Sequence, residues 1–554
     1  MSRPDASVLA KVLCCPSVNS RSNRFITIGL LVFTLFFCSI SVRANVYATD
    51  IRIDGSMNAG VIIPGGQIAV SYILNEDASL GVFVKIIAGT NVVWTNSFAG
   101  GSAGTLVGSN SFVWNGTNQA GTTVSPGVYQ VSITARSSGY STWTNITDDG
   151  PNFSAATPRG IDVNRNTNSP YYGRVFVSCT ASVFTILKCN ADGSPGDEGG
   201  SSDGGLTWGS GQMGGYADYS PWKIAVGADD TVYINDFNGA GLVYGFDETI
   251  ETNAYVDVVR EDNYPTNDDF PQLSGLYVTG AGTNALIWMT DELPVTSVGI
   301  LRWQLTSNDV AATNDSGTIV APVTNTSPLT QTPYDLAVDT NGCIYTIQSI
   351  TNNGPPGDVV MCFPPYAGIP ETNALWAVGF DPTLYNTYGI AVDQTATFVA
   401  VAVRGADPSS PGTGLLNLYY ATNGMLFTNL DQTGGDQYTD VAWDNVGNLY
   451  ALDDAAEVWR AYSPPGTNQA TTVAAPIIQA YNALIWPMLL NPNVDTNGIN
   501  FTLQGQNNVT YWIEQSPDMM TWTAVATNFS TFATRAVSIP FADNQDFYRA
   551  VVAQ

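Results

Sequence analysis

Histidine is absent from the 554-residue sequence, which removes the side chain most often used as a general base near neutral pH. Two stretches, at residues 100–104 and 200–204, match the G-x-S-x-G pattern of serine hydrolases. In those enzymes a histidine takes the proton of the serine. Both matches therefore reflect a composition rich in glycine and serine, and a Ser-His-Asp hydrolase is excluded.

Carboxylates remain as candidates for acid–base or metal chemistry. Asp236, Asp291, Asp453 and Asp454 follow short apolar stretches that we expect to be second strands of a repeated unit. Units arranged in a ring would gather these side chains near one rim, where their oxygens could hold calcium or transfer protons. The simpler alternative is that each aspartate closes a turn by bonding its own backbone.

A second group of residues could bind a ligand without reacting with it. Arg159, Trp222, Tyr334 and Tyr388 directly precede the opening residue of a recurring apolar strand, and Tyr438 lies near the start of another copy. Aromatic rings at a channel mouth could stack on sugar rings or hold a peptide. The alternative is that they pack between neighbouring repeats.

Four cysteines lie beyond the first 44 residues of the chain. Cys343 and Cys362 are symmetric about the centre of a predicted hairpin, which predicts a cross-strand disulfide between them. Cys179 and Cys189 each end a strand, so the same geometry separates them and leaves their pairing open. No C-x-x-C motif occurs, and a zinc site is not indicated.

The composition favours a large all-β protein. Charged residues are 12% and aromatic residues 11%, with 53 glycines and 30 prolines. Many turn formers and few charges argue against a helical protein. The formal net charge of −28 excludes a basic nucleic-acid binder.

An internal repeat organises the middle of the chain. An apolar strand opened by a small or charged residue recurs about every 50–60 residues, and a polar turn and a second strand follow most copies. The copies begin at Gly160, Lys223, Gly275, Asp335, Gly389 and Asp440. Repeats of this length made only of strands predict a six-bladed β-propeller over residues 157–478.

Residues 337–345 (Ala-Val-Asp-Thr-Asn-Gly-Cys-Ile-Tyr) and 442–450 (Ala-Trp-Asp-Asn-Val-Gly-Asn-Leu-Tyr) resemble repeats of the NHL type. The resemblance implies an NHL-like propeller. It says little about activity, because such propellers host both binding proteins and enzymes.

Two small β-sandwiches are expected to flank the propeller. In residues 45–136, the pattern Trp-Asn-Gly (114–116), Gly121 and Pro-Gly-Val-Tyr (126–129) resembles the Ig-like domain of the flagellar hook-capping protein. Residues 491–554 resemble a C-terminal β-sandwich found on large secreted bacterial proteins. Linkers are expected at 137–156 and 479–490.

The first 44 residues predict export. Arg21 and Arg24 precede an apolar run over residues 25–40, and Val42-Arg43-Ala44 offers a cleavage site. The alternative is a signal anchor. A cleaved signal peptide implies a mature chain without a membrane span. We expect it to be extracellular or on the cell surface, with the periplasm as the alternative.

Three hypotheses for function follow. The first, which we favour, is an exported non-catalytic protein whose propeller binds a glycan, a peptide or another partner at the cell surface. The second is a calcium-dependent lactonase or polysaccharide lyase that uses Lys223 or Tyr334 as its base. The third is a structural component of the cell envelope.

Overall fold

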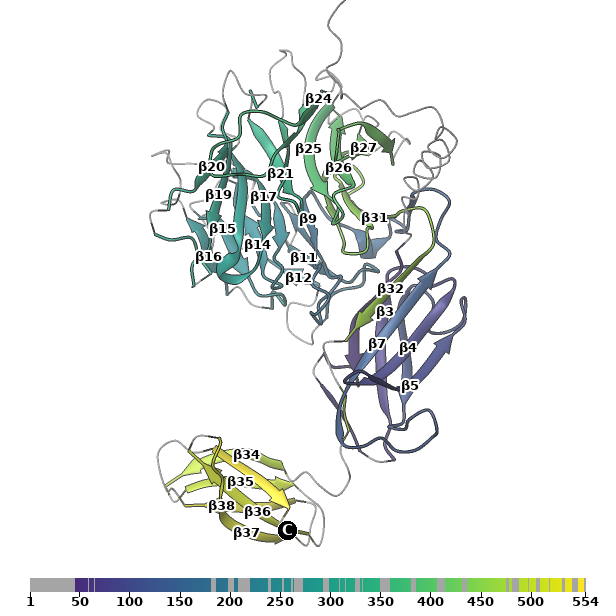
Figure 1. The fold of residues 1–554 in the computed structure, drawn as a ribbon, viewed down its shortest axis with the longest axis vertical. Helices are drawn as coiled ribbons and strands as arrows, with labels where there is room; N and C mark the ends of the chain where they lie inside the picture. The colour runs from purple at the N-terminus through teal and green to yellow at the C-terminus, as the bar shows by residue number, and fades with distance from the viewer. Residues whose placement is uncertain are drawn as a thin grey trace, which may run out of the picture. The chain divides into compact units, whose positions relative to one another are not determined.

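The protein is all-β in its computed structural model (Figure 1). The structure describes residues 45–57, 59–63, 65–180, 186–197, 204–207, 220–237, 241–251, 254–260, 263, 273–291, 298–307, 309–313, 315–323, 329–330, 332–348, 359–379, 385–405, 414–430, 436–474, 478–480, 488–496, 498–504, 509–517, 519–530, 534–540 and 547–552. Among them, no helix has the length and apolar character to span a membrane. The predicted signal peptide lies outside the described residues.

Six four-stranded antiparallel sheets make up the middle of the described chain, which we call the six-sheet unit. The first three contain β9 (Pro158–Val163), β10 (Val175–Cys179), β11 (Ile186–Cys189) and β12 (Gly205–Leu206); β13 (Ile224–Val226), β14 (Val232–Asn235), β15 (Gly241–Phe246) and β16 (Val256–Arg260); and β17 (Leu273–Thr279), β18 (Leu286–Asp291), β19 (Ile300–Gln304) and β20 (Thr318–Ala321). The next two contain β21 (Pro333–Val338), β22 (Ile344–Gln348), β23 (Val359–Phe363) and β24 (Trp376–Gly379); and β25 (Tyr385–Val392), β26 (Phe398–Gly405), β27 (Leu415–Tyr420) and β28 (Leu426–Asn429).

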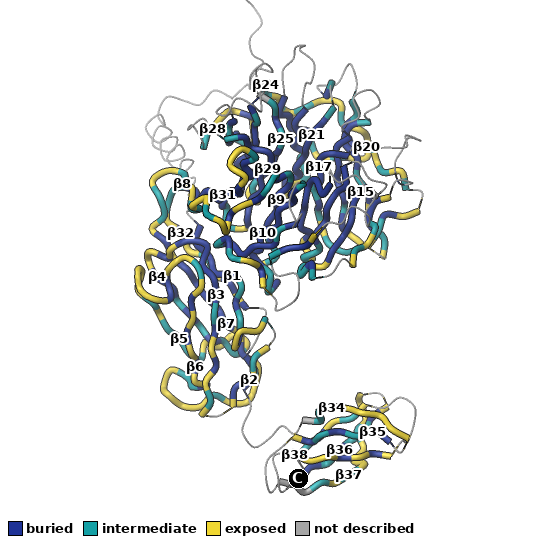
Figure 2. The backbone as a smooth tube through the Cα atoms, turned by 180° about the vertical axis from the view of Figure 1, so that it is seen from behind, coloured by how far each residue is buried: buried dark blue, intermediate teal, exposed yellow. Residues whose placement is uncertain are grey.

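The sixth sheet takes strands from both ends of this unit. β29 (Tyr438–Trp443), β30 (Leu449–Asp453) and β31 (Val458–Ser463) pair in sequence, and β31 pairs with β8 (Thr144–Asn145), which precedes the first sheet. The first strands of successive sheets contact one another, and β29 of the last sheet contacts β9 of the first. These inner strands are almost entirely buried (Figure 2).

Aspartates close several hairpins between first and second strands. The Asp339 carboxylate accepts hydrogen bonds from the backbone N–H groups of Asn341 and Cys343. Asp444 does the same with the N–H groups of residues 446–448. These are the Asp positions of the two NHL-like motifs, so the motif carries turn chemistry here.

The N-terminal two-sheet unit is built from chain segments that lie before and after the six-sheet unit in the sequence. One sheet has β1 (Ala48–Ile53), β3 (Ile68–Leu74) and β6 (Gly108–Trp114). The other has β2 (Gly60–Ile62), β4 (Gly81–Ala88), β5 (Asn91–Phe98) and β7 (Gly127–Ser137), together with β32 (Asn468–Val473) and β33 (Ile478–Ala480) from beyond the six-sheet unit. The sequence analysis assigned residues 468–478 to the propeller, and this assignment is wrong for β32 and for Ile478 of β33. Both strands instead pair with β7, where they cover the core of the N-terminal unit.

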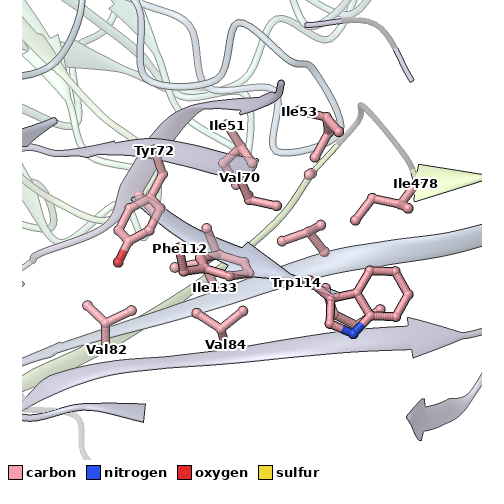
Figure 3. Packing of buried hydrophobic residues seen from close by; sticks show 14 of the residues in the cluster. Ile51, Ile53, Val70, Tyr72, Val82, Val84, Phe112, Trp114, Ile133 and Ile478 are labelled. Atoms are coloured by element: carbon pink, nitrogen blue, oxygen red, sulfur yellow. The ribbon is translucent and has the colours of Figure 1, made fainter. Parts of the chain in front are cut away.

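Both sheets of this unit share one hydrophobic core (Figure 3). Trp114 is fully buried, and its ring centre lies 5.7 Å from that of Tyr129. Ile478 is fully buried in the same core together with Ala474 and Ala480, although more than 300 residues separate these three from the rest of the cluster in the sequence. Strands β32 and β33 are therefore part of this fold, and the first two residues of the linker predicted at 479–490 lie in β33.

The C-terminal residues form a separate pair of three-stranded sheets. One contains β34 (Met488–Asp495), β35 (Gly498–Gln504) and β38 (Thr534–Ile539); the other contains β36 (Val509–Ser516), β37 (Thr523–Ser530) and β39 (Phe547–Val552). Leu503, Tyr511 and Ile513 are buried between them.

The predicted disulfide is not formed in the structure. All four described cysteines have free thiols, and the β22–β23 register places Cys362 opposite Tyr345 rather than Cys343. The hairpin is thus two residues out of the predicted register. A one-residue error in its assumed centre moves the cross-strand partner by two residues.

Candidate functional site: the axis and rim of the six-sheet unit

The first residues of the six repeats alternate between glycine and a charged residue. The glycines are Gly160, Gly275 and Gly389, and the charged residues are Lys223, Asp335 and Asp440. Because the inner strands contact one another around the unit, these positions come together although they are far apart in sequence. The three charged residues help to line a cavity with a volume of about 30 Å³, which is room for one or two water molecules.

Glycine permits the close approach of neighbouring inner strands. A Cβ added to Gly389 would lie 2.6 Å from the Asp440 Cα, and one added to Gly275 would lie 2.8 Å from the Asp335 Cα. No side chain can be accommodated at such distances without moving backbone. Glycine at the opening position of every second repeat is therefore required for the inner strands to pack this closely.

Lys223 pairs with two carboxylates across the axis. Its Nζ donates to Asp335 Oδ2 at 3.0 Å and to Asp440 Oδ1 at 2.6 Å. It also donates to the Tyr388 carbonyl oxygen at 3.2 Å. The lysine side chain is 3% exposed, and the carboxylates are 5% and 6% exposed. We call these three charged residues the axial triad.

The carboxylates of the axial triad also bind the backbone of adjacent sheets. Asp440 Oδ2 accepts from the Ile161 N–H at 2.9 Å, and Asp335 Oδ2 accepts from the Ile390 N–H at 3.1 Å. The triad thereby ties five of the six sheets together. Buried charges need such multiple partners to offset the loss of hydration.

Burial and ion pairing shift the pKa values of the axial triad in opposite directions. Burial lowers the pKa of Lys223, but the charges of Asp335 and Asp440 outweigh it, and the net shift is upward. Burial raises the pKa of Asp440 to about 7, opposed by Lys223. One ammonium neutralises only one of two carboxylates, so the other takes up a proton near neutral pH.

A protonated lysine with two carboxylate partners has no lone pair with which to accept a proton. Lys223 would have to give up both ion pairs before it could act as a general base. The geometry therefore matches a structural bridge and does not match Lys223 as the base of the enzyme hypothesis.

A group of buried and partly exposed residues lies next to the axial triad, where first strands begin and second strands end. The Arg159 guanidinium lies 5.3 Å from the centre of the Trp222 ring, and the Tyr334 and Tyr388 rings meet edge to face at 4.8 Å. Arg404 lies 5.6 Å from the Tyr388 ring centre. With Asp454, these residues form what we call the rim group.

Asp454 links the two arginines of the rim group. Its Oδ2 lies 3.1 Å from Arg404 and 3.6 Å from Arg159. Trp222 and Tyr334 are each 8% exposed and belong to one hydrophobic cluster that Tyr388 borders. Four of the five residues predicted to bind a ligand thus come together, mainly as packed side chains with polar edges.

Tyr438 does not join them. It is fully buried in another cluster, and its hydroxyl lies 2.8 Å from the Tyr462 hydroxyl. Arg460 donates to the same oxygen at 3.3 Å. The alternation of side chains along β29 turns Tyr438 away from the rim.

The four aspartates predicted to hold a metal are engaged by other groups. Asp291 accepts from the Val298 N–H at 2.7 Å, and Asp453 accepts from the Gln437 N–H at 2.9 Å. Asp236 accepts from the Ser220 hydroxyl. Within the described residues, no group of three or more acidic or cysteine side chains could hold a metal ion. The backbone bonds of Asp291 and Asp453 fit the alternative in which an aspartate closes a loop, whereas Asp454 pairs with Arg404 and Arg159.

Two features of the site were missed at the sequence level. Arg404 ends a second strand and carries no motif. The axial triad had a signal: Lys223 opens its repeat where the other copies have glycine or aspartate. A single lysine among aspartates at equivalent positions of contacting inner strands indicates an ion pair between those strands.

The sequence matches no known protein family and no curated protein. Among solved structures, a glucose dehydrogenase is 11% identical over 43% of this chain and 94% of its own, with a TM-score of 0.26. A glycoside hydrolase is 10% identical over 92% of this chain and 94% of its own, with a TM-score of 0.23. PorU from Porphyromonas gingivalis is 9% identical over 92% of this chain and 33% of its own, with a TM-score of 0.12. These TM-scores carry no argument about fold or activity.

Proposed function

We propose that the chain is an exported, non-catalytic binding protein whose six-sheet unit is an NHL-like β-propeller that holds a cell-surface partner at its rim. The pairing of β8 with β31 and the contact of β29 with β9 support a closed ring. Closure by a strand from the other end of the unit would protect both terminal edges.

One observation carries the choice of binding over catalysis. The charged groups at the axis are buried, paired with one another and bonded to the backbone of adjacent sheets. They stabilise the unit, and the ion pairs of Lys223 leave that lysine no lone pair with which to accept a proton. The rim group, by contrast, combines aromatic rings with partly exposed guanidinium groups, a combination suited to recognition.

The proposal is tested by depletion from solution. The purified chain is incubated with a panel of insoluble polysaccharides and with isolated cell envelopes, with and without calcium. Both bound protein and released sugar are measured. We expect depletion without release of sugar. Release of sugar, or calcium-dependent turnover, would favour the enzyme hypothesis instead.

Tyr388→Ala provides the variant for the rim, and Tyr366→Ala provides its control. Both rings carry an arginine nearby: Arg404 lies 5.6 Å from the Tyr388 ring centre, and Arg302 lies 4.4 Å from that of Tyr366. We expect Tyr388→Ala to reduce depletion and Tyr366→Ala to leave it unchanged. Equal loss in both variants would contradict a site at the rim.

A further inference from the structure

The outer face of one C-terminal sheet carries two tryptophans that do not pack in a core. This sheet has the order β37-β36-β39, and its inner face contributes Tyr511, Ile513 and Ala550 to a hydrophobic cluster. Trp512 alternates with the inner residues along β36, and Trp522 directly precedes β37. Both are partly exposed. All other tryptophans that the structure describes belong to a hydrophobic cluster or pack against one.

An ion pair lies on the same face. Arg549 of β39 is directly opposite Glu514 of β36, and its guanidinium lies 2.8 Å from the Glu514 carboxylate. The same guanidinium lies 4.1 Å from the centre of the Trp522 ring. The Arg549 side chain is 47% exposed, so this group remains open to a ligand at the surface.

The register of the strands sets the spacing of the two tryptophans. Thr523 pairs with Gln515, so the direction of β37 places Trp522 level with Ser516. Four residues separate that position from Trp512, which corresponds to about 13 Å along β36. Because Glu514 lies midway along this stretch, the face presents an indole, an ion pair and a second indole in a row. An extended chain that runs along β36 can contact all three.

The size and charge of this face favour a saccharide over a protein or an ionic polymer. β36 has 8 residues, so three strands give a face of roughly 26 Å by 14 Å, or about 400 Å². A stable protein interface needs about 800 Å² from each partner. Arg549 and Glu514 are the only charged residues of the three strands and neutralise each other. The net charge of −28 opposes binding of an anionic chain.

We propose that this face binds an uncharged, extended polysaccharide of the cellulose type, whose sugar rings stack on Trp512 and Trp522. Each ring of such a chain presents a flat C–H face and a rim of hydroxyl groups. The C–H faces match the indole rings, and the hydroxyl groups can bond to Arg549 and Glu514. The inference goes beyond the proposed function, because this site belongs to the C-terminal sheets and not to the rim group.

The test measures binding of cellohexaose to the full chain by titration calorimetry, beside maltohexaose. The two probes have the same sugar units and differ in their linkage, which makes cellohexaose extended and maltohexaose curved. A curved chain reaches only one of the two indole rings. We therefore expect cellohexaose to bind about threefold to tenfold more tightly, which is the factor that one aromatic contact is worth.

Trp512→Ala and Trp522→Ala should each remove this preference, and Val494→Ala is the matched control. Val494 is an apolar residue of the other C-terminal sheet and is 63% exposed. Val494→Ala should leave the affinity for cellohexaose unchanged, and so should Tyr388→Ala, which probes the rim. Near-UV circular dichroism checks that each variant folds. In the unchanged chain, saturating cellohexaose should also reduce hydroxyl-radical labelling of both tryptophans, a readout that needs no variant.

Three outcomes would overturn the inference. Absence of cellohexaose binding, or equal affinity for the two probes, would reject an extended glucan on this face. Loss of binding in Tyr388→Ala but not in the tryptophan variants would place the saccharide at the rim, which supports the proposed function without this site. Self-association in sedimentation that Trp512→Ala abolishes, with no cellohexaose binding, would make a second copy of the chain the occupant.

Discussion

Replacing Lys223 by methionine should destabilise the six-sheet unit strongly, and more so as the pH rises. Methionine keeps the apolar length of the side chain but removes the ammonium between Asp335 and Asp440. Breaking a buried ion pair by removal of one partner costs about 3–5 kcal/mol. With both carboxylates at most 6% exposed, water can compensate little of that loss.

The pH dependence follows from the protonation of the two aspartates. Without Lys223, their folded-state pKa values rise further above the unfolded values, so the folded protein holds protons that the unfolded chain releases. The stability of such groups is present at low pH and is lost as the pH rises. The destabilisation should therefore grow by about 1.4 kcal/mol per pH unit for each additional proton held, between about pH 5 and 8.

Hydrogen exchange measured by mass spectrometry isolates this unit from the others. Peptides that cover β21, β25 and β29 report opening of the inner strands, and peptides that cover β35 and β36 serve as an internal reference. The variant Lys223→Met/Asp335→Asn/Asp440→Asn should recover much of the loss, because each amide oxygen can still accept its backbone hydrogen bond. A penalty below about 1 kcal/mol, or one independent of pH, would refute an energetic role for the axial triad.

Four further predictions follow. Because burial raises the folded pKa of Asp440 to about 7, protection of β29 against exchange should fall as the pH rises from about 4 to 7, and Asp440→Asn should flatten that profile. Gly389→Ala places a Cβ 2.6 Å from the neighbouring Cα, so urea unfolding should show a loss of about 1–3 kcal/mol, whereas a neutral result would contradict the close packing. Ile478→Ala should cost about 2–5 kcal/mol and speed exchange in β7, and unchanged β7 exchange would argue against this strand completing the N-terminal unit. Iodoacetamide at pH 8 should modify partly exposed Cys343 before the three buried cysteines, for which burial raises the pKa to about 12, and preferential labelling of a buried cysteine would contradict the structure.

Local patterns predicted much of the fold because they act over short distances. The alternation of apolar residues marked the strands, and the all-β class is confirmed. A polar turn was expected after the first strand of most repeats, and in two of them Asp339 and Asp444 close that turn. The register at Cys362 and the pairing of β33 with β7 depend on which partner buries the most apolar surface, and no short pattern encodes that.

For the site, the sequence predicted that Arg159, Trp222, Tyr334 and Tyr388 lie together, because each precedes the same strand of its repeat. It could not place Arg404 or exclude Tyr438. A residue that ends a second strand carries no local mark, and a shift of one position along β29 turns a side chain to the opposite face of the sheet.

The sequence by itself determined which chemistry is absent and which segments form strands. Without histidine, no Ser-His-Asp site can exist, and the repeat alone sets the spacing of the inner strands. Only the tertiary structure decided that Lys223 meets Asp335, 112 residues away, and Asp440, 217 residues away. The reason is geometric, because equivalent positions of successive sheets come together only when the inner strands pack against one another. The protonation state of each charged side chain then depends on its neighbours from other repeats.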